Sequence, residues 1–347
     1  MPFYRWNGTE LEPGKVYRWN GTELEPGTVR VWPWIEIDPP TDPGDLDGGT
    51  PTTLVYGLAL DGGDPTLTVS SGDLVSNLSN PAYTGHRFGS AEWPQETMYA
   101  ANQLFTRHPY PYNVVGECDL HVLVDGTTLV LYHDASLTFG GTTRAISSMT
   151  KAEWDTVTIA SPIVGAPAQP AAFWDDPAYQ SKSVAAVYGN TRVLLPELKT
   201  PNARVPLMNW IAANEAEGSV IVQFAVYNGT AYTANIVAMA SAGIYTMPVL
   251  YSLPGSGTIP TLATMASDGV YGIMVSTTFL GANPTLITDA HAEGLKVYTF
   301  NSNSIATRDA QIALDVDNIL TDRPTLVIPA SFPGGGTTTQ SYDGGVP

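Results

Sequence analysis

Three short groups in the first half of the chain, and one pair downstream, combine bases with acids. They are His86-Arg87, Glu117-Cys118-Asp119, His133-Asp134 and, further along, Glu197-Leu198-Lys199. Three carboxylates can hold one hard divalent cation through oxygen ligands. Two histidines can take up and release a proton near neutral pH, and arginine and lysine can hold a phosphate. Together these residue types indicate a metal-assisted phosphodiester hydrolase.

The spacing of the acids predicts that they share one face of a strand. Residues i and i+2 of a strand project to the same side, so Glu117 should point with Asp119, and Glu197 with Lys199. We therefore expect Glu117, Asp119 and Glu197 to bind Ca²⁺ or Mg²⁺. The alternative is a set of unrelated surface carboxylates, in a chain that has 33 acids. Cys118, the single cysteine, should point the opposite way into packing.

Strand-like and helix-like segments alternate from about residue 82 to residue 328. The predicted strands are 82–84, 114–122, 129–132, 192–198, 219–224, 245–250, 272–275, 296–300 and 318–320. The predicted helices are 96–107, 204–217, 230–242, 259–267, 284–293 and 304–314. Roughly eight such βα units match the size of an α/β TIM (β/α)₈ barrel, whose active sites lie at the C-terminal ends of the strands. His86 follows the first predicted strand and His133 ends the third, so the chemistry falls at that end.

The first 37 residues contain a perfect duplication. The segment Tyr4–Gly14 recurs as Tyr17–Gly27 with a 13-residue period, and each copy carries an Asn-Gly dipeptide that suits a hairpin turn. Two short hairpins cannot bury a core alone. We therefore predict that residues 1–37 form an attachment region that needs a partner surface or sister chains, in a homo-oligomer such as a trimer or hexamer.

Composition divides the rest of the chain. Residues 38–53 are rich in Pro, Asp and Gly, which is typical of a linker, and residues 54–79 alternate apolar and polar residues, which predicts a short β segment. The barrel is expected over residues 80–328, and the Gly- and Thr-rich residues 329–347 are expected to form a flexible tail.

Charge excludes several partners. The formal net charge is −18, which argues against nucleic-acid binding and against adhesion to anionic membranes. A phosphodiester is itself anionic, so a bound cation and local Arg or Lys would have to reverse the field at the site. No apolar run is long enough to predict a membrane span, and the first residues lack the pattern of a signal peptide.

Motifs along residues 80–328 resemble, in order, those of the glycerophosphodiester phosphodiesterase family. The matching segments are His86–Gly89, Pro94–Thr97, Glu117–Leu120 with Asp125-Gly126, His133-Asp134, Ser148–Glu153, Leu195–Lys199, Tyr298–Asn301 and Asn318–Pro324. Any one of them is weak, but together they form a specific pattern. The resemblance implies the TIM barrel of that family and says nothing about residues 1–78.

The resemblance also implies roles. Glu117, Asp119 and Glu197 would hold the cation, and His86 and His133 would serve as general base and general acid, with His86 taken as the base. One histidine would deprotonate a neighbouring glycerol hydroxyl, which attacks phosphorus, while the other protonates the leaving alcohol. Water would then open the cyclic phosphate. The cationic catalytic candidates, Arg87 and Lys199, would stabilise the developing charge.

Two residues depart from the family pattern. Phe88 stands where the family has glycine after His-Arg, and we expect its ring to crowd the floor of the site. Gln95 stands where the family has glutamate, and the adjacent Glu96 could substitute for it.

Two classes of function fit the sequence. The first is metal-dependent hydrolysis of glycerophosphodiesters. The second is a catalytically retired barrel that serves as a structural or receptor-binding component, since the duplicated hairpins, linker and tail resemble a phage tail protein. The two combine in a virion tail enzyme, partnered by other tail proteins, that cleaves glycerophosphate polymers such as teichoic acids on a host surface. A sphingomyelinase-D-like lipase is disfavoured because no membrane-binding stretch is evident.

Overall fold

The computed structural model describes residues 73–109, 111–226 and 231–329 in full, together with the backbone of short strands before them. The chain divides into two compact units, residues 1–70 and 71–347. In the first unit, each copy of the duplication forms an antiparallel pair with the same register. These pairs are β1 (Tyr4–Trp6) with β2 (Leu11–Pro13) and β3 (Tyr17–Trp19) with β4 (Leu24–Pro26). Strands β5 (Leu54–Val55) and β6 (Leu58–Ala59) also pair. The Asn-Gly turns, the linker and the tail lie outside the described residues.

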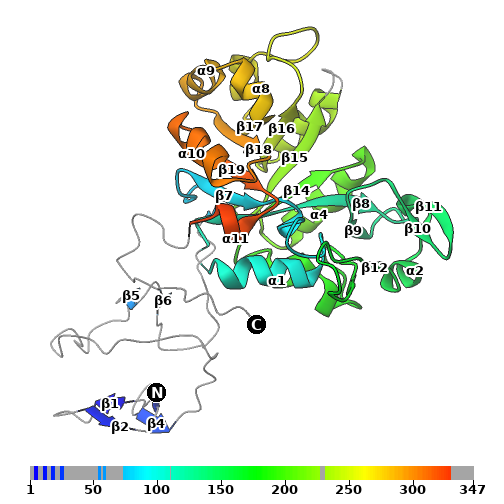
Figure 1. Cartoon of the computed structure of the whole chain (residues 1–347), viewed down its shortest axis with the longest axis vertical. Coiled ribbons are helices and arrows are strands. Elements are labelled where there is room, and N and C mark those ends of the chain that lie inside the picture. Colours follow the sequence, from blue (N-terminus) through cyan, green and yellow to red (C-terminus); the bar gives the residue numbers. More distant parts are fainter. Residues whose placement is uncertain are drawn as a thin grey trace. The chain divides into compact units, whose positions relative to one another are not determined.

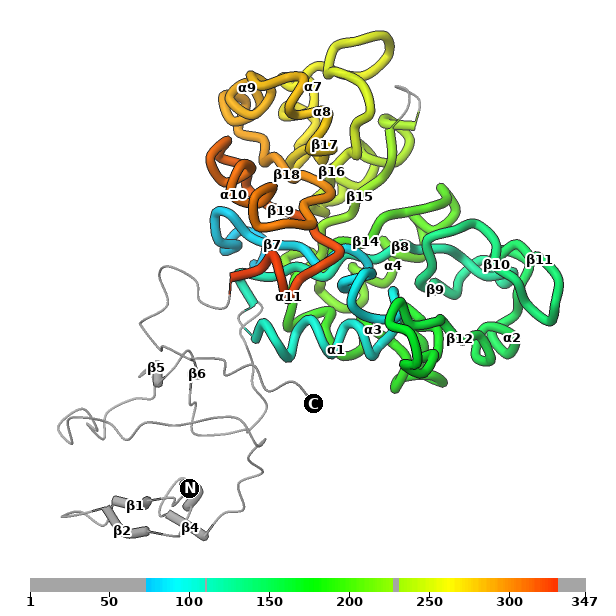
Figure 2. The backbone as a smooth tube through the Cα atoms, in the orientation of Figure 1, coloured from blue at the N-terminus to red at the C-terminus, as the bar shows by residue number. Residues whose placement is uncertain are grey.

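The second unit is built on a closed barrel of eight parallel strands (Figures 1 and 2). They are β7 (Ala82–Gly85), β8 (Val114–Val122), β14 (Val193–Leu198), β15 (Ile221–Val226), β16 (Tyr245–Leu250), β17 (Gly272–Ser276), β18 (Lys296–Phe300) and β19 (Asn318–Thr321). The last strand pairs with the first, so the sheet closes on itself. The predicted TIM barrel is confirmed.

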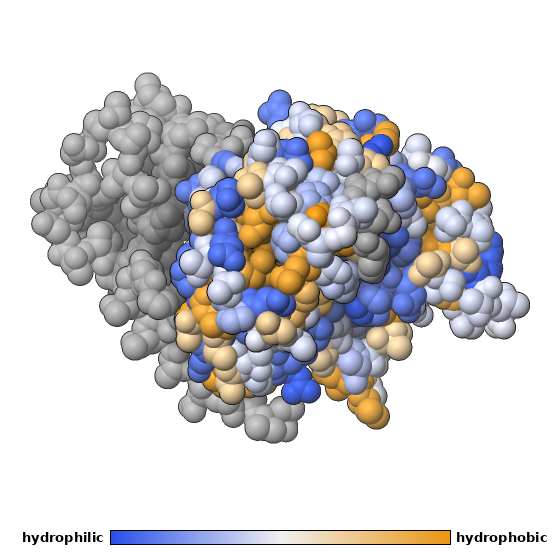
Figure 3. All heavy atoms as spheres, turned by 90° about the horizontal axis from the view of Figure 1, so that it is seen from above, coloured by the Kyte–Doolittle hydropathy of each residue, from blue (hydrophilic) through white to orange (hydrophobic). Residues whose placement is uncertain are grey.

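Helices follow the strands and cover the barrel. They are α1 (Met98–Arg107), α4 (Arg204–Ala213), the π-helical η6 (Tyr232–Val237) continued by α6 (Ala238–Ala240), α7 (Leu262–Ser267), α8 (Thr277–Ala282), α9 (Leu286–Ala292), α10 (Ile305–Ala313) and α11 (Pro324–Val327). Apolar and polar residues are interspersed on the face seen in Figure 3. Within the described residues, no helix has both the length and the apolarity of a membrane span.

One predicted barrel strand is not in the barrel. The segment β9 (Leu129–Leu131) runs antiparallel to β8, pairing His121 with Val130. The connection is a tight turn in which Asp125 Oδ1 accepts hydrogen bonds from the backbone N–H groups of Thr127 and Thr128, at 2.9 and 2.8 Å. A turn this short can join only antiparallel strands. The assignment of β9 as the third βα strand was therefore wrong, and β14 is the third barrel strand.

Between β9 and β14 lies an insertion with its own apolar core. It contains β10 (Ser136–Phe139), β11 (Thr142–Ala145), η3 (Ile146–Ser148), α2 (Lys151–Asp155), β12 (Thr158–Ile159), β13 (Gln169–Pro170), η4 (Gln180–Lys182) and α3 (Val184–Tyr188). Trp154 and Phe173 are fully buried at its centre. A capping box between Thr150 and Glu153 starts α2.

Residues 73–80 are attached to the N-terminal end of the barrel. Val75 is 1% exposed and its N–H donates to Gly218 O, just before β15. The hydroxyl of Tyr245, the first residue of β16, hydrogen-bonds the carboxylate of Asp73. The chain therefore enters the barrel at the end opposite Glu197 and Lys199, which lie at the C-terminal end of β14.

Candidate active site

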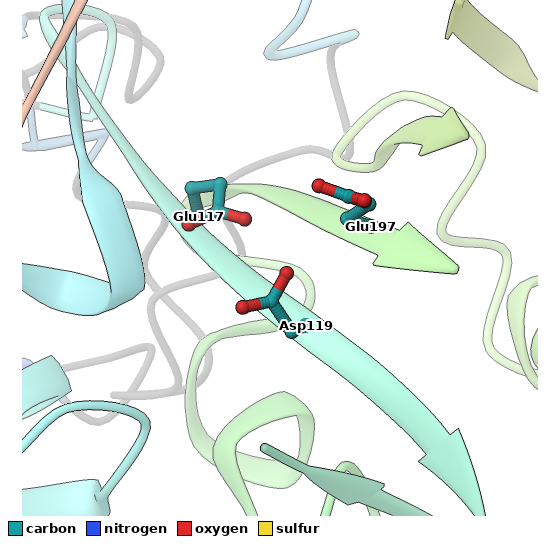
Figure 4. Close-up of side chains that lie close together, drawn as sticks. All are labelled: Glu117, Asp119 and Glu197. Atoms are coloured by element: carbon teal, nitrogen blue, oxygen red, sulfur yellow. The ribbon is translucent and has the colours of Figure 1, made fainter. Parts of the chain in front are cut away.

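Three carboxylates from two neighbouring strands meet in the barrel. Glu117 and Asp119 lie on β8 and Glu197 lies on β14, where the register pairs it with Asp119. One carboxylate oxygen of each residue lies within 4.8 Å of one oxygen of each of the other two. Figure 4 shows the three side chains close together beside the two strands. Glu117 and Asp119 are each 1% exposed. Cys118, between them, is buried on the other face of the strand, in the apolar core, as predicted.

The oxygens of this cluster fit a hard cation. Glu117 Oε1 accepts from Gln223 Nε2 at 3.1 Å, and Oε2 accepts from the backbone N–H of Arg87 at 2.7 Å. Asp119 Oδ2 is buried and accepts no hydrogen bond from the described residues, although the charged Arg87 Nε lies 3.3 Å away. Burial and the charge of Asp119 raise the pKa of Glu117 to about 8. Burial also raises the pKa of Glu197. A bound divalent ion stabilises the charged form of carboxylates that lie this close together and are largely shielded from solvent.

With divalent cations removed, we expect the stability of the protein to fall between about pH 5 and pH 8. Glu117 has a pKa of about 8 in the folded state against an ordinary 4.5. Between these values the folded state keeps a proton that the unfolded state has lost, so raising the pH favours unfolding. Urea unfolding in chelator across this range measures the slope. Glu117→Gln should flatten the slope, and an unchanged slope in that variant would contradict the assignment.

His86 is held at the rim by a partly buried hydrogen-bond network. It lies in η2 (His86–Phe88), directly after β7, and its Nδ1 is 2.5 Å from Asp322 Oδ1. Asp322 also accepts hydrogen bonds from Ser90 Oγ and Asn303 Nδ2, each at 2.6 Å. Burial alone would lower the pKa of His86, but Asp322 and Glu117 reverse this and raise it. Burial opposes the charge on Asp322, yet its hydrogen bond to His86 holds its pKa well below the ordinary value.

If His86 transfers a proton in phosphodiester hydrolysis, as the sequence predicts, replacing Asp322 with asparagine should lower kcat about 10- to 100-fold, the range for partners that orient a metal-bound imidazole. The His86 pKa should fall, because the carboxylate that stabilises its charged form is gone. The limb of the pH–rate profile that follows His86 then moves to lower pH. Asp309→Asn, at an exposed carboxylate on α10, is the control. A reduced kcat with an unmoved profile would argue against this role.

The two cations predicted from the sequence both lie against the acids. Lys199 Nζ is 3.0 Å from Glu197 Oε1 and 3.3 Å from Asp119 Oδ1. Arg87 Nε is 3.3 Å from Asp119 Oδ2. Although burial opposes it, the neighbouring carboxylates raise the pKa of Lys199, so this side chain stays charged. Positive charge therefore lies next to the cluster in a strongly acidic protein, as binding of an anion requires.

His133 lies on the loop after β9 and is the most accessible of the candidate groups. Its side chain is 36% exposed, and Nδ1 is 3.0 Å from Asp134 Oδ1. The pKa of His133 is lowered, mainly by burial. The negative charge of Asp119 raises this pKa, and the positive charges of Arg87 and Lys199 lower it. His121 supports this loop, since it is 3% exposed and its ring hydrogen-bonds the backbone of His133.

The expected crowding by Phe88 was wrong. Its ring is 0% exposed and packs edge-on against Phe105, with centroids 6.3 Å apart. Gly116 on β8 leaves the necessary space, since a Cβ there would lie 2.6 Å from the Phe88 ring. The left-handed backbone at Phe88, with φ of 61°, accompanies this inward direction. The ring is therefore part of the core and not of the site.

Gln95 and the adjacent Glu96 make separate contacts near the acid cluster. Gln95 Oε1 accepts from Arg87 Nη1 at 3.0 Å. Glu96 is 0% exposed, and its Oε1 accepts from the backbone N–H of Asp119 at 2.7 Å. Glu96 thus lies against the acid cluster, and burial, with the charges of Asp119 and Glu117, raises its pKa well above the ordinary value.

Sequence reasoning did not single out Gln223, Asn303 or Ser90, and it gave Asp322 no role. Gln223 faces the cluster because β15 is in register with β14 at Glu197, and strand register cannot be read from one chain. Asp322 did carry a signal, since it lies in the Thr-Asp-Arg-Pro segment that resembles the family's closing motif.

Comparison with known proteins places the fold. No family model matches the chain, and no curated protein matches it. An Oleispira antarctica phosphodiesterase solved with its product sn-glycerol-3-phosphate is similar, at 17% identity and a TM-score of 0.55, over 72% of this chain and 96% of that one. A glycerophosphodiester phosphodiesterase from Agrobacterium tumefaciens is similar at 18% identity and a TM-score of 0.54, over 70% of this chain and 97% of that one. A glycerophosphodiester phosphodiesterase from Parabacteroides distasonis is similar at 17% identity and a TM-score of 0.52, over 71% of this chain and 94% of that one. The chain thus has the TIM-barrel fold of glycerophosphodiester phosphodiesterase structures.

Proposed function

We propose that this protein hydrolyses glycerophosphodiesters with the help of one divalent cation, Ca²⁺ or Mg²⁺. The observation that carries the proposal is the cluster of Glu117, Asp119 and Glu197 at the C-terminal end of the barrel, bordered by His86 and Lys199. Carboxylate oxygens are the ligands that these cations prefer. The likeness to phosphodiesterase structures, one of them bound to sn-glycerol-3-phosphate, supports the same class of substrate.

The hydrogen bonds of the histidines suggest their reactive atoms. His86 Nδ1 is committed to Asp322, which leaves Nε2, 4.0 Å from Glu117, to take a proton from the glycerol hydroxyl next to the phosphodiester. That oxygen attacks phosphorus, and the bond to the leaving alcohol breaks. His133, whose Nδ1 is bonded to Asp134, protonates the leaving oxygen from Nε2. Water then opens the cyclic phosphate, with the two histidines in reversed roles.

The other groups act on charge. Glu117, Asp119 and Glu197 would hold the cation, which would supply a Lewis acid for the phosphoryl oxygens and for the attacking hydroxyl. Lys199 and Arg87, placed beside the same carboxylates, stabilise the negative charge that develops on phosphorus oxygens. Asp322 stabilises the imidazolium that forms when His86 takes up the proton.

For the biological setting we propose a virion tail enzyme acting on glycerophosphate polymers such as teichoic acids. The duplicated hairpins of residues 1–37 motivate this, because such pairs need a partner surface or sister chains to become stable. The competing function is a catalytically retired barrel that serves the tail as a structural or receptor-binding component. It keeps the fold without the chemistry.

Turnover of defined substrates tests the proposal. Purified protein should release glycerol phosphate from glycerophosphodiesters, or from teichoic acid, when Ca²⁺ or Mg²⁺ is added. Full-length protein is used, since the hairpins belong to the chain. Failure to release product from either substrate with either cation would sink the enzymatic function and favour the scaffold.

A further inference from the structure

A groove with a volume of about 1200 Å³ lies where β8 and β15 end, and no residue of the acid cluster lines it. Its walls come from the end of β8 and the turn after it, from η5 (Pro201–Ala203) with the start of α4, and from η6. Pro201 lies two residues after Lys199, and Phe224 directly follows Gln223. Since the chain advances at most about 3.6 Å per residue, the backbone of Pro201 lies within about 8 Å of that of Lys199, and the backbone of Phe224 adjoins that of Gln223. The groove is also larger than the usual range for small-molecule sites, about 300–1,000 Å³.

The groove is free of negative charge. None of the sixteen described residues that line it is acidic, although the chain has 33 acids and a net charge of −18. Asp125, in the adjoining turn, directs its carboxylate to Thr127 and Thr128. Arg204 is the single charged residue among those lining residues, and within the described part of the chain it forms no ion pair. An unpaired guanidinium in a wall without carboxylates is suited to a phosphate.

A second polar group in the wall lacks a partner. Asn235 on η6 lines the groove and is 3% exposed. Its Nδ2 donates to Ala231 O at 3.0 Å, which leaves Oδ1 buried and without a hydrogen-bond partner among the described residues. Buried acceptors are normally satisfied, so this oxygen invites a donor from a ligand, such as a hydroxyl. A fatty chain would leave it unsatisfied, which makes a lipid a poor occupant.

We propose that this groove binds a further polyol-phosphate unit of an extended substrate, with a phosphate on Arg204 and a hydroxyl on Asn235. The inference rests on the proposed function and narrows its substrate to chains of repeating polyol phosphate. The unit being cleaved lies in the barrel, and its neighbour lies across the rim between β14 and β15. Longer substrates therefore bind more tightly than a single diester.

The test compares glycerophosphoglycerol with oligo(glycerol phosphate) of about five units. Wild-type kcat/KM should be about tenfold higher for the oligomer, and Arg204→Ala should remove most of this advantage while leaving the short diester unchanged. Asn235→Leu, matched in size, should remove part of it. Arg107→Ala on α1, whose guanidinium bonds Gln103 outside the groove, is the matched control. Thermal melting of each variant checks the fold.

Binding measurements separate this proposal from the proposed function. Fluorescent oligomer should bind wild-type protein about tenfold more tightly than it binds Arg204→Ala, whether or not turnover occurs, and added salt should reduce the difference. Tight, Arg204-dependent binding without turnover would refute the enzyme and keep the groove. Equal affinity for short and long substrates, equal losses on both in Arg204→Ala, or a preference for lysophosphatidylglycerol that ignores Arg204 would overturn the groove.

Discussion

Alanine at His133 or at His86 should lower kcat for a glycerophosphodiester by about 100- to 10,000-fold, the range for loss of a general acid or base. Each ring has one nitrogen bound to a carboxylate, Asp134 or Asp322, which leaves the other nitrogen for proton transfer. Neither is counted among the three predicted metal ligands. The change should therefore appear in kcat, while the affinity for Ca²⁺ or Mg²⁺, measured by calorimetry, stays within a few fold.

His108→Ala is the matched control. His108 is also a buried histidine, 8% exposed, and burial lowers its pKa to about 4, but it lies at the end of α1. Its loss should reduce thermal stability with little effect on kcat in the remaining folded protein. If His108→Ala and His133→Ala reduced kcat equally, the loss at His133 would reflect folding and not proton transfer.

Loss of the cation should have a comparable effect. We expect chelation to abolish activity and added Ca²⁺ or Mg²⁺ to restore it. Without the ion, the three carboxylates offer only negative charge, and no Lewis acid is present to polarise the phosphoryl oxygens. The same ion should raise the melting temperature, since a ligand that binds the folded state alone stabilises it by about 2.7 kcal/mol at 100 times its Kd. Glu117→Gln and Glu197→Gln should lose both responses.

The control for this experiment is Glu293→Gln, an exposed glutamate after α9. It should keep the activity and the cation-dependent rise in melting temperature. A melting temperature of Glu117→Gln that still rises with the cation as in wild type would place the ion elsewhere. Activity that persists in excess chelator would remove the metal from the mechanism.

The acid cluster could be predicted because its geometry is local. Alternation along β8 places Glu117 with Asp119 whatever the rest of the chain does, and the strand was predicted with its observed bounds, Val114–Val122. The placement of Glu197 opposite Asp119 needed more, namely that β14 is the next strand of a closed barrel. The resemblance of motifs in order supplied that information.

The remaining features depend on contacts that a single chain does not reveal. The apolar run at β9 suits a parallel or an antiparallel strand equally, and only the turn at Asp125 decides between them. The direction of the Phe88 ring depends on the absence of a side chain at Gly116, on a different strand. Neither relation has a periodicity, so neither could be read from spacing.

The attachment of residues 73–80 to the N-terminal end of the barrel bears on how the protein can be mounted. A surface or a fused partner joined directly to Asp73 would be attached at the pole of the barrel that the hydrogen bonds of Val75 and Asp73 define. The acid cluster is at the opposite pole. For the proposed enzyme, a linkage made at Asp73 would leave the opening of the barrel on the side away from the attached surface, where a cell-wall polymer could reach it.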